Sequence, residues 1–314
     1  MRAFLVATLG MVLLVGATAP ARGQPESLPT LRINAPDTLS ALSARVEQFP
    51  TTRLATAMTL AGLRDPGPPI DVYLSPEDSD LARRTPPWIS GFADAGRNLV
   101  VLFPARANGY PSNSLESLLH HEVAHVLFSR AARGHSVPRW FNEGLAMAAE
   151  RPLALSDRTR LAWTLIRHGS PSLADLERLF GGGRAANQRG YAVASALVRD
   201  LLRVHGENGA ARVLSLLGQG QGFDAAFVGA TGEPLTHALD RFWSRQRVWG
   251  RWLPFLTGPA FLWSLITMLA LFAIGANRRR RAEQRRVWDE EETADAERAA
   301  RERLLKGDPG GSVH

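Results

Sequence analysis

Two histidines flank a short motif that could hold a metal ion, in the order His121-Glu122-Val123-Ala124-His125. Residues four apart lie on one face of a helix, so the imidazoles of His121 and His125 can reach a single ion. Glu122 is rotated by about 100° from His121 and can approach the open side of that ion without binding it. There its carboxylate can take a proton from water. The spacing therefore predicts a hydrolytic metal site on a helix.

A catalytic zinc site needs a third protein ligand, and because the chain has no cysteine, His, Asp or Glu must supply it. The metzincin pattern would place Gly at position 128 and His or Asp at 131, where this chain has Phe128 and Ala131. Glu143 lies 18 residues after His125, near the start of a second predicted helix. A loop of roughly ten residues lets that helix fold back on the first. Glu143 is therefore predicted to complete the ligand set.

The segment HEVAH, followed by WFNEGLA at residues 140–146, resembles the gluzincin zinc metallopeptidases, especially the peptidase MA-like family. The resemblance covers roughly residues 70–243. It implies Zn²⁺ as the cofactor and a peptide or protein as the substrate. It also implies that three residues are the zinc ligands: His121, His125 and Glu143. Glu122 would be the general base.

Further roles follow from the resemblance. A hairpin strand of such enzymes usually binds peptide by strand addition, and here the candidate is Ser90–Asp94. The oxyanion also needs a donor. Tyr191 occupies a downstream position where relatives often carry tyrosine, and His135, between the two motif helices, is the alternative. Met147 stands where some gluzincins carry an aspartate that orients a zinc-bound histidine, so this partner must come from elsewhere or be absent.

The elements that must position these residues follow from the periodicity of apolar residues. Strands are predicted at 31–34, 70–74, 88–93 and 98–103. Turn residues join the last two strands as a hairpin. Helices are predicted at 38–49, 53–63, 114–131, 139–150, 157–168, 172–180, 189–205, 209–217 and 234–247. A small N-terminal sheet followed by helices predicts an α+β fold with a zincin-like helical C-terminal half.

Two apolar segments predict the location of the protein. Residues 1–23 have a charged start, an apolar run and small residues at the end, the pattern of a secretory signal peptide. Residues 252–277 carry no charge and are long enough for one transmembrane helix, with the lipid bilayer as a partner. Residues 24–247 would then form an extracytoplasmic domain, periplasmic or extracellular, and residues 278–314 a charged cytoplasmic tail.

The composition excludes several classes of protein. With 45% hydrophobic and 21% charged residues, the chain is neither disordered nor collagen-like. The absence of cysteine removes disulfides, thiolate metal sites and cysteine nucleophiles. The net charge of +7 does not predict nucleic-acid binding, because six arginines lie between residues 278 and 286.

The sequence thus predicts a membrane-anchored zinc metallopeptidase that hydrolyses peptide bonds outside the cytoplasm. The alternative is a catalytically weak or inactive scaffold of the same fold that binds envelope proteins, and Met147 is its main support. An intramembrane protease does not fit, because Glu116 and His120 make the motif helix too polar for a membrane span.

Overall fold

The computed structural model describes residues 25–305 except 108, 110 and 258, so the predicted signal peptide at 1–23 lies outside the described residues. The chain divides into two compact units, Met1–Gln246 and Arg247–His314. The first unit contains the sheet and every residue singled out above for chemistry.

A four-stranded mixed sheet forms the N-terminal part of the first unit, in the order β1-β2-β4-β3. β1 (Leu31–Asn34), β2 (Ile70–Leu74) and β4 (Leu99–Leu102) are parallel, and β3 (Gly91–Asp94) pairs antiparallel with β4. The predicted hairpin is therefore confirmed, and β3 is an edge strand of the sheet.

The sheet forms because apolar residues alternate along its strands. In β2, Ile70, Val72 and Leu74 are fully buried, whereas Asp71 and Tyr73 lie on the opposite face. Each fully buried aliphatic side chain stabilises the fold by about 1.5–3 kcal/mol. The packing of this face of the sheet against the helices that cover it is therefore a major source of stability.

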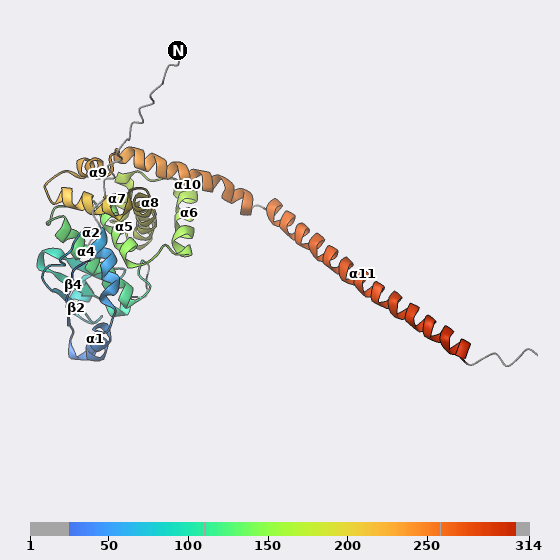
Figure 1. The fold of residues 1–314 in the computed structure, drawn as a ribbon. Coiled ribbons are helices and arrows are strands. Elements are labelled where there is room, and N and C mark those ends of the chain that lie inside the picture. Colours follow the sequence, from blue (N-terminus) through green and yellow to red (C-terminus); the bar gives the residue numbers. More distant parts are fainter. Residues whose placement is uncertain (1–24, 108, 110, 258, 306–314) are drawn as a thin grey trace, which may run out of the picture. The chain divides into compact units, whose positions relative to one another are not determined.

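Helices make up most of the remaining chain (Figure 1). Their bounds are α1 Ser40–Val46, α2 Leu54–Ala61, α3 Asp80–Arg84, α4 Leu115–Ala131, α5 Arg139–Glu150, α6 Leu155–His168, α7 Leu173–Leu179, α8 Arg184–Leu217, α9 Phe223–Thr231, α10 Leu235–Thr257 and α11 Pro259–Leu305. α8 consists of two helices that meet at a kink at Gly206, whose φ is 71°, and this agrees with the two helices predicted at 189–205 and 209–217. α4 packs against β3 and β4 on one side and against α5 on the other, which places the motif helix between the edge strand and the second motif helix.

Close contact between α5 and α8 depends on one glycine. A Cβ atom at Gly144 would lie 2.4 Å from Cγ2 of Val198 and 2.6 Å from the carbonyl oxygen of Ala194. A side chain at this position would push α5 away from α8. Glu143 is the neighbouring residue, so its position is fixed by the tight packing of α5 against α8.

The prediction of a transmembrane helix at 252–277 is wrong. Among the residues that the structure describes, no helix combines the length and the apolar character needed to cross a membrane. The apolar run is divided between two helices. α10 carries four arginines ahead of the run, and α11 continues beyond the run through charged sequence to Leu305. The fold class is corrected accordingly: the chain is mostly helical with a small four-stranded sheet, and the predicted bilayer partner loses its support.

Candidate metal centre and active site

The helix α4 brings the HEVAH motif into the interior. Ser114 caps its N-terminus by accepting a hydrogen bond of 3.1 Å from the backbone N–H of Ser117. His121 is only 3% exposed, Glu122 is also buried, and His125 is half-buried. Burying consecutive ionisable side chains costs several kcal/mol unless partners compensate. Such partners should therefore surround the motif.

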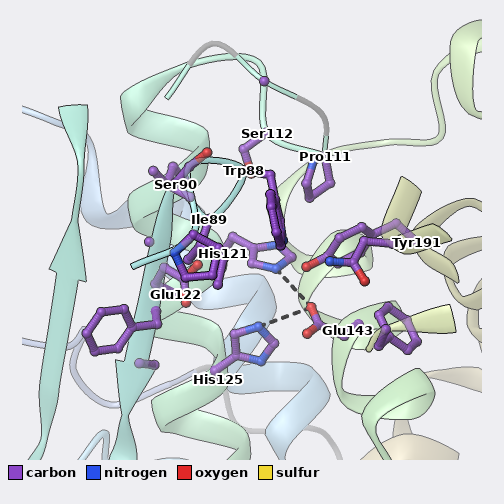
Figure 2. Close-up of a pocket in the computed structure, with 18 of the residues that line it drawn as sticks. Trp88, Ile89, Ser90, Pro111, Ser112, His121, Glu122, His125, Glu143 and Tyr191 are labelled. Atoms are coloured by element: carbon purple, nitrogen blue, oxygen red, sulfur yellow. Dashed lines mark hydrogen bonds and ion pairs between the residues drawn. The ribbon is translucent and has the colours of Figure 1, made fainter. Parts of the chain in front are cut away.

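The first partner is Glu143 of α5. Its Oε2 atom lies 3.3 Å from Nε2 of His121 and 3.4 Å from Nε2 of His125, and Figure 2 shows both rings facing this carboxylate. Within the described residues, these three side chains form a group whose ligand atoms all lie within 4.8 Å of one another. Donor atoms bonded at about 2.0–2.1 Å to a tetrahedral zinc are themselves about 3.3–3.4 Å apart. The observed spacing therefore fits zinc.

The electrostatic potential at the three side chains also favours a cation. Burial alone would lower the pKa of His121, but hydrogen bonds with Glu143 and Glu150 outweigh it and raise that pKa to about 10. Burial would also lower the pKa of His125, but the negative charge of Glu143 raises it overall. Burial would raise the pKa of Glu143, yet the nearby histidines hold it well below its usual range. The carboxylates thus create a negative potential at the imidazole pair, as a divalent cation requires.

Glu122 lies on the other side of the histidines, against the edge strand. A Cβ atom at Gly91 would lie 3.2 Å from Cγ of Glu122, so the lack of a side chain at this position allows β3 to pass close to Glu122. Burial raises the pKa of Glu122, and the charges of His125 and His121 work against this rise. A carboxylate in this environment holds a proton more readily than one in water.

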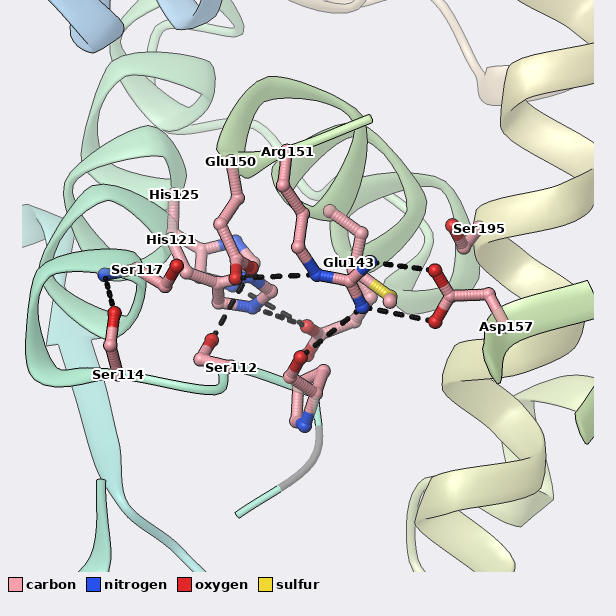
Figure 3. Close-up of polar contacts among 12 residues, drawn as sticks. Ser112, Ser114, Ser117, His121, His125, Glu143, Glu150, Arg151, Asp157 and Ser195 are labelled. Atoms are coloured by element: carbon pink, nitrogen blue, oxygen red, sulfur yellow. Dashed lines mark hydrogen bonds and ion pairs between the residues drawn. The ribbon is translucent and has the colours of Figure 1, made fainter. Parts of the chain in front are cut away.

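Glu150 is a partner of His121 that the sequence analysis did not identify. Its Oε2 atom lies 3.2 Å from Nδ1 of His121 and accepts a hydrogen bond of 3.3 Å from the hydroxyl of Ser112 (Figure 3). The Glu150 side chain is fully buried. It stands seven residues after Glu143, two helical turns along the same face, and this spacing was the available signal. Glu150 thus gives His121 a carboxylate contact, which Met147 cannot provide. Nδ1 of His125, in contrast, has no hydrogen-bond partner in the described part of the chain.

A second buried charge pair lies behind Glu150. Arg151 places Nε 3.7 Å from Oε1 of Glu150 and binds both carboxylate oxygens of Asp157, at 2.6 and 2.9 Å. Asp157 also accepts a hydrogen bond from the backbone N–H of Ala154 and so caps α6. The carboxylate of Glu150 therefore lies between an imidazole and a guanidinium group that is itself anchored.

The three candidate ligands open into a cavity of about 1010 Å³. Its walls come from the loop before β3, from α4 and α5, and from the segment between α7 and α8. Such a volume accommodates several residues of an extended peptide.

The superfamily of the chain follows from comparison with protein families. The Peptidase MA superfamily matches residues 52–248, more than half of the chain and the whole of the site. The chain belongs to this superfamily. No curated protein matches the chain. Membership of the Peptidase MA superfamily indicates a peptidase-like fold, and the convergence of His121, His125 and Glu143 adds a candidate metal site to it.

The structure separates the two oxyanion donors that the sequence predicted for this Peptidase MA protein. Tyr191 lines the cavity, and its ring centre lies 6.4 Å from that of His121 (Figure 2). His135 is not among the described residues that line the cavity. Its Nδ1 atom lies 3.0 Å from the carbonyl oxygen of Ala132, beyond the C-terminal end of α4. Only Tyr191 remains a candidate for the oxyanion donor.

The predicted peptide-binding strand, Ser90–Asp94, coincides with β3 and the residue before it. The backbone N–H of Phe103 donates a 2.8 Å hydrogen bond to the carbonyl oxygen of Ser90. Backbone groups alternate in direction along an antiparallel pair, so those of Gly91 and Ala93 point away from β4. These groups form the open edge of the sheet, beside the cavity that both residues line.

Proposed function

We propose that this protein is a zinc-dependent peptidase that hydrolyses peptide bonds with Glu122 as the general base. The observation that carries the proposal is the convergence of two imidazole Nε2 atoms on one carboxylate oxygen, at 3.3 and 3.4 Å. Membership of the Peptidase MA superfamily supports the same class of reaction.

Zinc would be held by Nε2 of His121, Nε2 of His125 and the carboxylate of Glu143. When bound, the ion would polarise a water molecule and the carbonyl group of the peptide bond. Glu150 would orient His121 by accepting a hydrogen bond from its Nδ1–H group, which leaves the Nε2 lone pair available for the ion.

Glu122 is the residue proposed to move the proton. Its carboxylate is buried beside the histidine pair and beside the edge strand, where water and the peptide carbonyl would meet. It accepts a proton from water and later gives that proton to the leaving amine. The raised pKa of Glu122 favours both steps, because a base with a pKa nearer neutrality also serves as an acid at the pH of the reaction.

The remaining roles belong to Tyr191 and β3. The hydroxyl of Tyr191 would donate a hydrogen bond to the oxyanion that develops on the peptide carbonyl. The free backbone groups of Gly91 and Ala93 would bind the substrate as an added antiparallel strand. This arrangement presents the peptide bond between the edge strand and the motif helix.

The inactive-scaffold alternative loses its main argument. It rested on Met147, which cannot orient a histidine as an aspartate would. Glu150 makes that contact instead, at 3.2 Å from Nδ1 of His121. The ligand set therefore has a carboxylate partner behind it, as catalytic zinc sites usually do.

Substituting Glu122 by Gln tests the proposal directly. The full-length variant should bind one equivalent of zinc, as the wild type does, and lose hydrolysis of a mixed peptide substrate by about 10²- to 10⁴-fold. Glu116→Gln is the matched control, because Glu116 lies on the same helix with its side chain partly exposed and paired with Arg53. Full hydrolysis by Glu122→Gln, or no bound zinc in the wild type, would contradict the proposal.

A further inference from the structure

A cationic side chain lies beside the proposed zinc ligand Glu143, on the side away from the histidines. Nε of Arg139 is 3.6 Å from Oε1 of Glu143, whereas the other carboxylate oxygen faces the two imidazoles. Arg139 is in the first turn of α5 and lines the cavity, and its side chain is 52% exposed. Its guanidinium group is thus separated from the metal site by the width of one carboxylate.

An aromatic ring holds this guanidinium group in place. The central carbon of Arg139 lies 5.2 Å from the ring centre of Phe180, and the Phe180 ring is in turn 5.4 Å from that of Tyr191. A guanidinium group held over a ring keeps its N–H groups available at its edge, in the planar fork that fits a carboxylate. Arg139 is therefore oriented before a ligand arrives.

The charges around the cavity favour an anionic ligand. Three arginines line it: Arg106, Arg139 and Arg184. Arg106 is occupied, because its side chain is largely buried and ion-paired with Glu77 at 2.7 Å. Arg184 is exposed at the start of α8, close in sequence to Phe180. Among the described residues that line the cavity, the acidic groups are Glu122 and Glu143, both part of the proposed catalytic centre.

We infer that this site selects peptides that carry a carboxylate next to the scissile bond, and that Arg139 and Arg184 bind it. The inference rests on the proposed function, since it names the substrate class of the same site. The carboxylate has two possible sources: an Asp or Glu side chain within the peptide, or the free C-terminus of a peptide.

The ion pair with Glu143 does not by itself account for Arg139. Pairs that are half exposed contribute little to stability, typically less than about 1 kcal/mol. Glu143 also has the two histidines as closer partners. A guanidinium group in this place has N–H groups left for a second carboxylate.

Binding measured without turnover tests the inference. The full-length Glu122→Gln protein, with zinc added, is titrated into fluorescein-labelled heptapeptides of Ala and Leu, and binding is followed by fluorescence anisotropy. One series places Glu or Gln at each position in peptides with an amidated C-terminus. A second series compares a free C-terminal acid with the amide. In one of the two series, the best-bound acidic peptide should bind about 10- to 100-fold tighter than the matching neutral peptide. The series that shows this difference identifies whether the carboxylate belongs to a side chain or to the C-terminus.

Matched variants then assign the preference to residues. Arg139→Gln and Arg184→Gln, each in the Glu122→Gln background, should reduce the preference severalfold, and Arg139→Lys should retain part of it. Arg158→Gln should keep the full preference, because Arg158 is an exposed residue of α6 that does not line the cavity. Zinc content is measured for every variant, because a loss of zinc would show that the substitution has displaced Glu143.

Two results would overturn the inference. One is equal affinity for acidic and neutral peptides throughout both series, including no detectable binding of any peptide. The other is a preference that survives in both Arg139→Gln and Arg184→Gln. Hydrolysis by the wild type is scored separately. An arginine-dependent preference without any hydrolysis would support carboxylate recognition and reject the peptidase proposal.

Discussion

The lining of the cavity contains two groups of side chains that are built differently. In the buried group, the ionisable side chains contact one another: His121 contacts Glu143 and Glu150, and Glu143 contacts both histidines. The exposed group consists of Arg139, Arg184 and Trp88, and Trp88 is 44% exposed.

This difference separates the chemistry from the recognition of the substrate. Buried polar groups must be fully partnered, so a change at one of them disturbs its neighbours as well. Exposed groups on the cavity wall can change one at a time, with effects limited to the ligand that they contact. Substitutions in the two groups should therefore differ in both size and kind.

Removal of the third ligand should have the largest effect. Glu143→Ala leaves two histidines to hold the metal, so zinc affinity should fall by more than about 100-fold, beyond the effect expected for an outer partner. Calorimetric titration with zinc measures this change, with Glu116→Ala as the control on α4. Unchanged affinity in Glu143→Ala would remove this residue from the ligand set.

Substitution of Glu150 should have the next largest effect, because Glu150 acts on zinc only through His121. Glu150→Gln keeps the volume and an acceptor for Nδ1 but removes the charge, and zinc affinity should fall about 10- to 100-fold. Met147→Leu, at the position where some gluzincins place the aspartate, should leave the affinity unchanged because leucine keeps the apolar character and nearly the volume of this buried side chain. Equal zinc affinities of the wild type and Glu150→Gln would show that the contact between Glu150 and His121 does not affect zinc binding.

The Asp157–Arg151 pair should affect stability rather than zinc binding, and it should do so in a pH-dependent way. Burial would raise the pKa of Asp157, but hydrogen bonds from Arg151 and from the backbone of Ala154 lower it overall. A lowered folded-state pKa contributes stability above the unfolded value of 3.8, and this contribution disappears as the pH falls through the lower folded value.

Urea unfolding at a series of pH values tests this prediction. Asp157→Asn should be less stable than the wild type by about 1–3 kcal/mol at pH 7, and the two proteins should converge below about pH 4. A constant difference between them from pH 7 to pH 3 would contradict the assignment.

The smallest effect should come from the exposed group. Trp88 lines the cavity (Figure 2). Trp88→Ala should raise KM for peptides about 2- to 10-fold, the effect of one aromatic contact, while zinc affinity stays the same. Trp163, exposed on α6 outside the cavity, provides the control as Trp163→Ala. A loss of zinc from Trp88→Ala would contradict the distinction between the two groups.

Much of the site followed from local sequence. The periodicity placed α5 at its observed bounds and α4 within one residue of them, and the spacing of His121 and His125 placed both rings on one face. Glu143 could be proposed because a short loop forces two adjacent helices to pack. These are relations between residues that are close in the chain, which is where sequence patterns are informative.

Other features depend on contacts between distant residues. Glu150 contacts Ser112 and His121 across 38 and 29 residues. Its spacing of seven residues from Glu143 indicates a shared helix face but not these contacts. The parallel pairing of β2 with β4, past the hairpin strand β3, is likewise a tertiary property. The transmembrane prediction was wrong because hydropathy alone does not reveal that the apolar run is shared by two helices, each of which extends into charged sequence.

Anomalous diffraction at the zinc absorption edge, on crystals of the zinc-loaded full-length protein, tests the central claim most directly. We predict one zinc ion per chain, bonded to Nε2 of His121, Nε2 of His125 and a carboxylate oxygen of Glu143, at about 2.0–2.2 Å. An anomalous signal at other residues, or a Glu143 carboxylate turned away from an ion held by the histidines alone, would contradict the account.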